Sequence, residues 1–407
     1  MTEDEKTVNP SVSPKVLENL RQGAPPYGMS SYFTVGDSGD IQGLESLIGG
    51  KGPHLIEAAP GCGKSHLLDH VREKALEQGF IVSLVRLDSE QEIRFNRLDQ
   101  IVGAVFRALE VPGIGDVKGI RPFMNNVCEA IEDSRFKNQT DEFWTRLTNE
   151  WKWDVDIHNT LESPALYVAL RAWCHGSINA QSLVEDWLHH PWRYYKDRRS
   201  LVRALIEDLR SNFVDPRPPS VLFSNKTRIF HFKEPEYVQS WAALRDIEKL
   251  TTAAGYKGFV LLFDEMSDIY DRLGNLKFLK IALTNLFRFL QPEFFDGKSF
   301  FAVDTDFERK CRDEFAKKRQ GAYDLSRLDQ IPRFRMAPLE EGHLVALADK
   351  IIRIHSAAYG WNGDASDVRR EVNSLVQSQA RSVSEHMPRQ VVRAVVEFLD
   401  AKLEDHS

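Results

Sequence analysis

A glycine-rich stretch near the N-terminus has the residue types and spacing to hold a polyphosphate. Residues 58–65 read Ala-Ala-Pro-Gly-Cys-Gly-Lys-Ser, which fits the pattern A/G-x-x-x-x-G-K-S/T with alanine in place of glycine at the first position. Glycines allow backbone N–H groups to turn toward phosphate oxygens, and the start of a helix adds a favourable dipole. Lys64 could then reach the β- and γ-phosphate oxygens, and the Ser65 hydroxyl could ligate Mg²⁺.

The neighbouring segments supply the elements that such a loop requires. Residues 54–58 read as a short apolar strand, residues 66–79 as a helix that Gly79 ends, and residues 80–87 as a strand rich in β-branched side chains. This alternation predicts a parallel sheet with crossover helices. In this context a phosphate-binding loop is favoured over a chance match in a turn.

Two adjacent carboxylates end the next apolar strand, which we predict at residues 258–265. Asp264 is suited to orient Mg²⁺ and its water, and Glu265 to polarise an attacking water. Alone, the pair could be a solvated strand end that caps the next helix. With the loop present, catalysis is the favoured interpretation, and the second carboxylate indicates hydrolysis of ATP rather than storage of the nucleotide.

Composition and charge limit the class of protein. With 42% hydrophobic and 28% charged residues, the 407-residue chain can bury a core. A net charge of −7, from 53 basic and 60 acidic residues, argues against binding nucleic acid or anionic lipid through bulk charge and leaves room for a local basic groove. The N-terminus is polar, and no stretch approaches the roughly 18 to 20 apolar residues of a spanning helix. We therefore expect a soluble, cytoplasmic protein with no membrane partner.

Cysteine spacing indicates neither a disulfide framework nor a structural zinc site. The cysteines lie far apart and form no C-x-x-C pair, which favours a reducing cytosol. Residues 174–175 (Cys-His) and 189–190 (His-His) fit no established zinc spacing, so we expect them to be buried without a metal. Position 62, inside the loop, could make the enzyme sensitive to thiol reagents. The four cysteines are Cys62, Cys128, Cys174 and Cys311.

The rest of the chain completes one α/β core around a long helical stretch. Residues 299–305 and 331–336 read as two more strands, which brings the predicted total to five. Between the second and third strands, about residues 90–250, apolar spacing is largely helical and includes seven of the eight tryptophans. The segment after Pro338 is helical again.

This arrangement resembles the AAA+ branch of P-loop ATPases, and particularly the initiator-like ATP-binding proteins of BREX and related phage-defence systems. Four stretches carry the resemblance: residues 23–36, 57–80, 255–265 and 387–400. The Trp-containing helical segments between the second and third strands are also similar to that family. The resemblance covers nearly the whole chain, although those segments match only loosely.

The resemblance implies an AAA+ fold with defined parts. We expect a five-stranded parallel sheet with a large helical insertion between strands 2 and 3 and a C-terminal helical lid, with ATP–Mg²⁺ bound between core and lid. The expected boundaries are 1–30 for an N-terminal tail and linker, 31–90 and 251–338 for the ATPase core, 91–250 for the insertion and 339–407 for the lid.

The resemblance also assigns residues to the nucleotide. The segment from Phe33 to Gly36 would close over the adenine, although the usual Gly-Arg of that segment is Gly-Asp here because Asp37 follows. Ser65 and Asp264 would hold the metal. The expected nucleotide-binding residues are Phe33, Val35, Gly36, Pro60, Gly61, Cys62, Gly63, Lys64, Ser65, His66 and Arg389.

Further residues are placed at the reaction by the same resemblance. Asp304 and Thr305 lie where a polar sensor residue touches the γ-phosphate or the attacking water, and Thr305 is the more conventional choice. Arg327 precedes the fifth strand, where such proteins place an arginine finger that completes a neighbour's site, which would imply a ring or arc of subunits. A surface arginine that pairs with Asp324 or Asp329 is an equal alternative.

Arg389 resembles a second sensor, a lid residue that couples the angle of the lid to the nucleotide state. The alternative is a plain arginine at a helix start. The expected catalytic set is Lys64, Asp264, Glu265, Asp304, Thr305 and Arg327.

Two segments combine positive charge with features of nucleic-acid binding. Residues 192–199 interleave aromatic and basic side chains, which could stack on bases and follow phosphates. Acidic Asp186, Glu207 and Asp208 flank them, so a salt-bridged helix entry with buried rings is the favoured interpretation. The basic run at 309–319 could face a ring centre or be an ordinary wet helix face.

Two functions remain open. In the first, the protein is an ATP-hydrolysing motor or loader on DNA in a bacterial anti-phage system. In the second, it is an ATP-gated assembly switch or scaffold that binds a protein partner and hydrolyses ATP slowly. The resemblance implies a homo-oligomer, other defence-system proteins as partners and DNA as a further candidate. The chain ends soon after the lid, which leaves little room for a separate DNA-binding domain and keeps the switch open.

Overall fold

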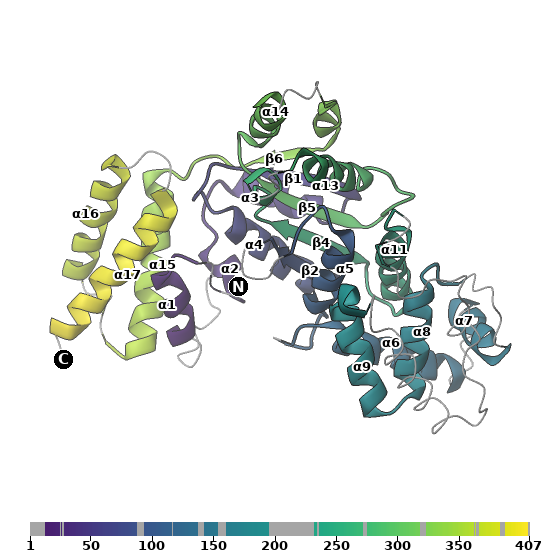
Figure 1. Cartoon of the computed structure of the whole chain (residues 1–407). Coiled ribbons are helices and arrows are strands. Elements are labelled where there is room, and N and C mark those ends of the chain that lie inside the picture. The colour runs from purple at the N-terminus through teal and green to yellow at the C-terminus, as the bar shows by residue number, and fades with distance from the viewer. Residues whose placement is uncertain are drawn as a thin grey trace.

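The computed structural model shows a central sheet with a helical lid on one side and a helical insertion on the other (Figure 1). Residues 195–199 of the aromatic and basic segment and residues 318–319 at the end of the basic run lie outside the described residues. The structure describes residues 13–24, 26, 28–87, 93–115, 117–136, 142–153, 160–194, 232–233, 236–271, 275–317, 323–361, 363, 366–382 and 387–405.

The sheet contains the five predicted strands, which run parallel, and one more. Its order is β3-β2-β4-β5-β1-β6, with β3 antiparallel to β2. The predicted count of five is therefore wrong for the described part of the chain, since residues expected at the end of a helix form the two-residue edge strand β3. The strands are β1 Gly52–Glu57, β2 Ile81–Arg86, β3 Leu109–Glu110, β4 Phe259–Asp264, β5 Lys298–Val303 and β6 Arg333–Arg335.

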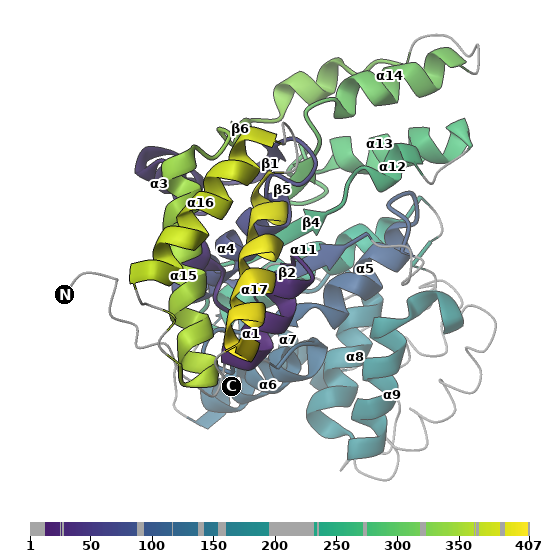
Figure 2. The same cartoon turned by 90° about the vertical axis from the view of Figure 1, so that its left-hand side faces the viewer.

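The helices fall into a sheet-covering group, an insertion group and a lid group. The helices of the sheet-covering group lie on both faces of the sheet, and the helices of the insertion group continue outward from one of these faces (Figures 1 and 2). The helices are α1 Ser13–Arg21, α2 Ser30–Phe33, α3 Ser38–Leu47, α4 Lys64–Glu77, α5 Leu98–Arg107, α6 Ile120–Phe136, α7 Glu142–Trp153, α8 Pro164–His175, α9 Ile178–His189, η2 Pro191–Arg193, α11 Val238–Ala253, α12 Asp268–Asp271, α13 Leu276–Arg288, α14 Phe307–Lys317, η4 Ser326–Gln330, α15 Glu341–Tyr359, α16 Ser366–Ser382 and α17 Met387–Asp405.

Central strand β4 is apolar along its length because both of its faces are covered. Val260 and Leu262 pack with α3 and α4, whereas Leu261 and Phe263 pack with α5, α11 and α13. Successive side chains of a strand point to opposite faces, so an uninterrupted apolar run is what a doubly covered parallel sheet requires. This burial fixes the strand ends, where the polar residues of the site begin.

The lid is a bundle of α15, α16 and α17 that also takes in α1. Val16, Leu17 and Leu20 of α1 are buried in the same apolar cluster as the lid helices. Arg21 donates two hydrogen bonds of 2.8 Å to the Asp400 carboxylate of α17. Part of the segment expected to be an N-terminal tail and linker is therefore a helix that packs against the lid.

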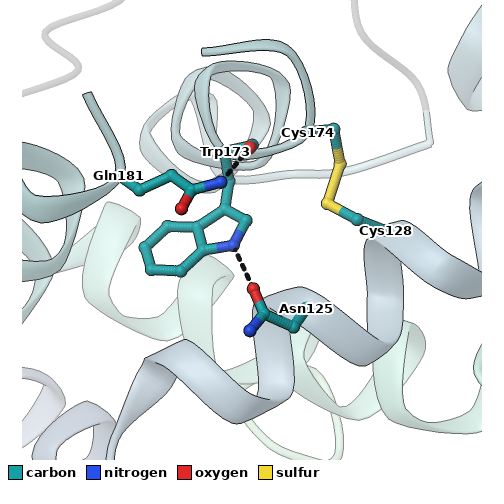
Figure 3. Close-up of a disulfide and its surroundings, with 5 residues drawn as sticks. All are labelled: Asn125, Cys128, Trp173, Cys174 and Gln181. Carbon is teal, nitrogen blue, oxygen red and sulfur yellow. Dashed lines mark hydrogen bonds between the residues drawn. A yellow bond between two sulfur atoms is a disulfide. The ribbon is translucent and has the colours of Figure 1, made fainter. Parts of the chain in front are cut away.

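The buried side chains of the insertion helices, α6 to α9 and α11, form one apolar cluster with those on one face of the sheet. Trp173, Trp187 and Trp241 are fully buried in it. Figure 3 shows Trp173 donating through Nε1 to Asn125 Oδ1 at 2.8 Å, while its carbonyl accepts from Gln181 Nε2 at 3.0 Å. These bonds join α6, α8 and α9 around one tryptophan.

A disulfide joins Cys128 of α6 to Cys174 of α8, with 5.5 Å between their Cα atoms (Figure 3). The expectation that the sequence holds no disulfide is therefore wrong. The two cysteines are 46 residues apart, and only the packing of α6 beside α8 brings them together. Cys174 is used by this bond, so it is not available to the metal site that we considered and disfavoured.

Candidate active site

The glycine-rich loop lies between β1 and α4, as predicted. Gly61 and Gly63 have φ values of 79° and 97°, a left-handed backbone that other residues rarely adopt. The turn at Gly63 lets α4 begin at Lys64, so the start of the helix and its free N–H groups border the loop. A polyphosphate bound here would face these N–H groups and the positive end of the helix dipole.

Lys64 is held by three acceptors at the head of the loop. Its Nζ donates to the carbonyls of Ala58 and Ala59 at 3.1 Å each and to Asp304 Oδ1 at 2.8 Å. An ammonium group carries three N–H donors, so these contacts engage all of them. The Lys64 and Asp304 side chains are only 15% and 12% exposed, which strengthens the pair relative to one on the surface.

Asp304 directly follows β5 and receives a second hydrogen bond through its other oxygen. The Tyr270 hydroxyl donates to Oδ2 at 3.0 Å, and Lys310 Nζ lies 3.7 Å from the same oxygen. Burial alone would raise the pKa of Asp304, but the hydrogen bonds from Lys64 and Tyr270 outweigh it and hold the pKa below its ordinary value. Asp304 is therefore a carboxylate at neutral pH, and the neighbouring Thr305 is exposed.

Asp264 and Glu265 lie at the end of β4, as the sequence predicts, but in different surroundings. Asp264 is 3% exposed, and its Oδ1 accepts from the Glu265 N–H at 2.9 Å. Its Oδ2 lies 3.9 Å from Arg86 Nε, beyond hydrogen-bonding distance, which leaves room for a further ligand. Glu265 is exposed and has a φ of 60°, a left-handed conformation that side chains of its size seldom adopt and that is found most often at functional sites.

Strand order explains why these groups meet. β5 lies between β1 and β4, so Asp304 stands between the loop that follows β1 and the carboxylates that follow β4. Ligands of open α/β sheets bind outside the carboxyl ends of the strands. The sheet thus gathers one lysine and three carboxylates where a polyphosphate and its metal would bind.

A pocket of about 260 Å³ opens beside α4 and the start of the lid. Val35 and Gly36, two of the residues predicted to close over an adenine, line it together with Leu67, Phe334 and His343. Phe33, the third such residue, is 2% exposed and packs among the lid helices instead.

His66 follows Ser65 in the first turn of α4 and joins the N-terminal segment rather than the phosphate loop. Its Nε2 lies 3.0 Å from Thr34 Oγ1, and His70 Nδ1 lies 3.2 Å from the same oxygen. Burial, and then the charges of His70 and Lys350, lower the pKa of His66 to about 4. The ring is therefore neutral at pH 7 and adds no charge to the site.

The two arginines assigned by resemblance lie away from this cluster of contacts. Arg327 is exposed on η4, and Arg389 donates through Nη2 to the Gln22 carbonyl at 3.3 Å. Within the described residues, neither bonds to Lys64 or Asp304. Their roles as finger and second sensor stay predictions.

The donor set suits Mg²⁺ with ATP. Mg²⁺ keeps several waters and takes one or two protein ligands plus phosphate oxygens. A serine hydroxyl beside the loop lysine and one buried carboxylate with a spare oxygen, Ser65 and Asp264, match that demand. In the part of the chain that the structure describes, no group of three His, Cys, Asp or Glu side chains forms an all-protein metal cage.

The described basic side chains of both candidate nucleic-acid segments are paired with acids. On α14, Arg309 bonds to Asp306 at 2.7 Å, and Lys317 bonds to Glu314 at 2.6 Å. In the other segment Tyr194 donates to Asp186, and Arg193 lies 3.7 Å from the same carboxylate. This agrees with the salt-bridged alternative for the described part of residues 192–199.

Sequence reasoning missed Tyr270, which donates to Asp304, and Arg86, whose Nε lies 3.9 Å from Asp264. Arg86 ends β2 and donates to Asp69 at 2.8 Å beside Asp264. Its position near a carboxyl strand end was a usable signal, because the strand predicted at residues 80–87 is apolar except for Ser83 and has this one charged residue just before its end. No comparable signal marks Tyr270, whose contact depends on how α12 packs.

The comparisons with known proteins give one match. Residues 8–181 and 237–407, most of the chain, match the family model described as BREX system ATP-binding protein BrxC/D. No curated protein and no solved structure matches the chain. In the described residues no helix is long and apolar enough to cross a membrane.

Proposed function

The chain belongs to the BrxC/D family of BREX system ATP-binding proteins, and we propose that it hydrolyses ATP at the site formed by Lys64, Asp264, Glu265 and Asp304. The observation that carries this proposal is the convergence of a loop lysine and three carboxylates at the carboxyl ends of β1, β4 and β5. Family membership supports ATP as the ligand. The catalytic step is our inference from the residues.

Each residue has a defined task in the proposed reaction. Lys64 leaves Asp304 for the β- and γ-phosphate oxygens. Ser65 and Asp264 would hold Mg²⁺, which would neutralise phosphate charge. Glu265 takes a proton from the attacking water as the γ-phosphate is transferred. Asp304, next to the γ-phosphate position, orients that water.

We propose that turnover drives a motor or loader on DNA, as the family resemblance implies. Arg327 would complete the site of a neighbouring subunit in a homo-oligomer, and other proteins of the BREX system would be partners. In this arrangement the lid would report the nucleotide state through Arg389.

The second candidate is an ATP-gated assembly switch that binds a protein partner and hydrolyses ATP slowly. The observation that favours it is the pairing of described basic side chains with acids on α14 and at Asp186. Such pairs leave little net positive charge for a phosphate backbone. This favours the switch, because a switch that binds a protein partner does not require a DNA-binding surface.

Phosphate release distinguishes these proposals when it is measured with and without single- and double-stranded DNA, beside a mass measurement in ATP. We expect Lys64→Ala to abolish release and Lys51→Ala to leave it unchanged, since Lys51 is exposed and pairs with Asp296. DNA-stimulated release supports the motor. ATP-dependent assembly without any response to DNA excludes the motor and supports the switch.

A further inference from the structure

Tyr270 connects the segment after the two catalytic carboxylates to Asp304. It lies on α12, five residues beyond Glu265, and is 8% exposed. Its hydroxyl donates to Asp304 Oδ2 at 3.0 Å, while Lys64 occupies Oδ1 at 2.8 Å. One carboxylate is thus shared between the phosphate loop and α12.

Lys64 cannot keep all of its present partners when it binds phosphate. Its N–H groups are engaged by two loop carbonyls and Asp304, so reaching a nucleotide requires it to release at least one. The charged partner Asp304 competes most directly with a phosphate for the ammonium group. Once Lys64 turns away, Asp304 Oδ1 loses this hydrogen bond.

Two groups could then control the direction of the Asp304 carboxylate. Tyr270 is within hydrogen-bonding distance of Oδ2, whereas Lys310 Nζ lies 3.7 Å from that oxygen and 3.1 Å from Asp306. Lys310 also donates to the Tyr270 hydroxyl at 3.4 Å, so the tyrosine bridges the lysine and the carboxylate. Without the tyrosine hydroxyl, Oδ2 would lose the hydrogen bond that fixes its direction, and Lys310 on α14 would be left as the neighbouring cation at that oxygen.

The tyrosine ring is held by its surroundings. It packs against Phe307 with 5.8 Å between ring centroids, and Lys310 Nζ lies 5.1 Å from its centroid. Burial, and then the Asp304 charge, raise the pKa of the Tyr270 hydroxyl well above its ordinary value. The hydroxyl therefore stays protonated and remains a donor over the working pH range.

We propose that Tyr270 is a positioning residue for ATP hydrolysis, which keeps Asp304 directed at the γ-phosphate end of the site after Lys64 has moved to the nucleotide. This inference rests on the proposed function. Tyr270 bonds to Oδ2 and Lys64 to Oδ1, so the Tyr270 bond does not require Lys64 to stay in place, and its loss should affect the reaction more than the binding of ATP. It acts through Asp304 and does not itself touch the nucleotide.

The test compares Tyr270→Phe with Tyr323→Phe. Tyr323 is a matched control, because it also packs on α14, stacks on Phe315 and makes a hydroxyl contact of 3.3 Å to Thr284 that does not involve Asp304. We expect Tyr270→Phe to lower kcat about tenfold, the size expected from one lost hydrogen bond to a charged group, with KM and the Kd for ATP within about twofold of the parent. Tyr323→Phe should match the parent in all three.

A second measurement uses binding of ADP with aluminium fluoride, which mimics the transferring phosphoryl group. Its affinity should fall in Tyr270→Phe by about the same factor as kcat, since the lost interaction matters in the transition state. A kcat unchanged by Tyr270→Phe, an equal loss in Tyr323→Phe, or an ATP affinity that falls as much as kcat would each overturn the positioning role. A parent protein that does not hydrolyse ATP would remove the proposed function as well, so the two failures are distinguishable.

Discussion

Asp304→Asn should tighten ATP binding while it slows hydrolysis. Lys64 donates to Asp304 at 2.8 Å, and both side chains are largely buried, at 15% and 12% exposure. ATP must take Lys64 from this partner, so the pair opposes binding. The same carboxylate is our candidate for orienting the attacking water.

The size of the effect follows from the change in hydrogen-bond type. A hydrogen bond to a charged group contributes about 1.5–3 kcal/mol and a neutral one about 0.5–1.5 kcal/mol. Replacing the carboxylate by an amide therefore weakens the competing contact by about 1–1.5 kcal/mol, which corresponds to an ATP Kd about five- to tenfold lower. Removing one negative charge near the triphosphate acts in the same direction.

The assay is titration of a fluorescent ATP analogue with Mg²⁺ in a Glu265→Gln background, so that bound nucleotide is not consumed. Asp306→Asn is the matched control, because Asp306 bonds to Arg309 and Lys310 and not to Lys64. It should bind ATP within about twofold of the background. A folded Asp304→Asn protein that binds ATP more than about threefold more weakly would refute the reasoning, since Asp304 would then be a binding group and not a competitor.

Three further predictions concern the scaffold. Protein purified without reductant should show two free thiols when denatured and four after reduction, because Cys128 and Cys174 are bonded; four at the outset would contradict the disulfide. Burial raises the pKa of Asp246 from 3.8 to about 6. Between about pH 4 and 6 this carboxyl is therefore more protonated in the folded state than in the unfolded state, and the free energy of unfolding falls as the pH rises through that range. Asp246→Asn should flatten this slope in urea midpoints, and an unchanged slope would disprove the assignment. Asp400→Asn should lower the free energy of unfolding by about 1–3 kcal/mol, because Asp400 accepts two 2.8 Å bonds from the guanidinium that ends α1. Asp349→Asn, at a half-buried position whose contact with Arg369 is 3.8 Å long, should change it by under about 0.5 kcal/mol; equal losses would contradict the packing of α1 on the lid.

The fold could be predicted where a segment has a single clear pattern of apolar side chains. The five parallel strands are apolar runs bounded by turn residues. β3 was missed because Leu109 and Glu110 extend a helical pattern and become a strand only by pairing with β2. A strand of two residues is too short to have a recognisable alternation of apolar and polar side chains, so its pairing with β2 could not be predicted.

The site was predictable where chemistry is local in sequence. Lys64, Asp264 and Asp304 each end or follow a predicted element, so strand order alone brings them together. The Lys64–Asp304 bond itself was not predictable, because it joins residues 240 positions apart. For the same reason the sequence hid Tyr270, whose contact depends on the packing of α12.

The disulfide shows the same limit. Spacing statistics detect frameworks of closely placed cysteines, whereas Cys128 and Cys174 meet because two helices of the insertion pack side by side. Seven of the eight tryptophans fall in the predicted insertion, and three of them, Trp173, Trp187 and Trp241, are buried in the apolar cluster that its helices share with the sheet.

The central claim, that this site hydrolyses ATP, is tested most directly by Glu265→Gln. We predict that this variant binds ATP with the affinity of the parent and releases no phosphate above background. The control is Glu293→Gln, an exposed glutamate that follows α13, whereas Glu265 precedes this helix; it should hydrolyse ATP at the parent rate. Phosphate release by Glu265→Gln at the parent rate would contradict the claim.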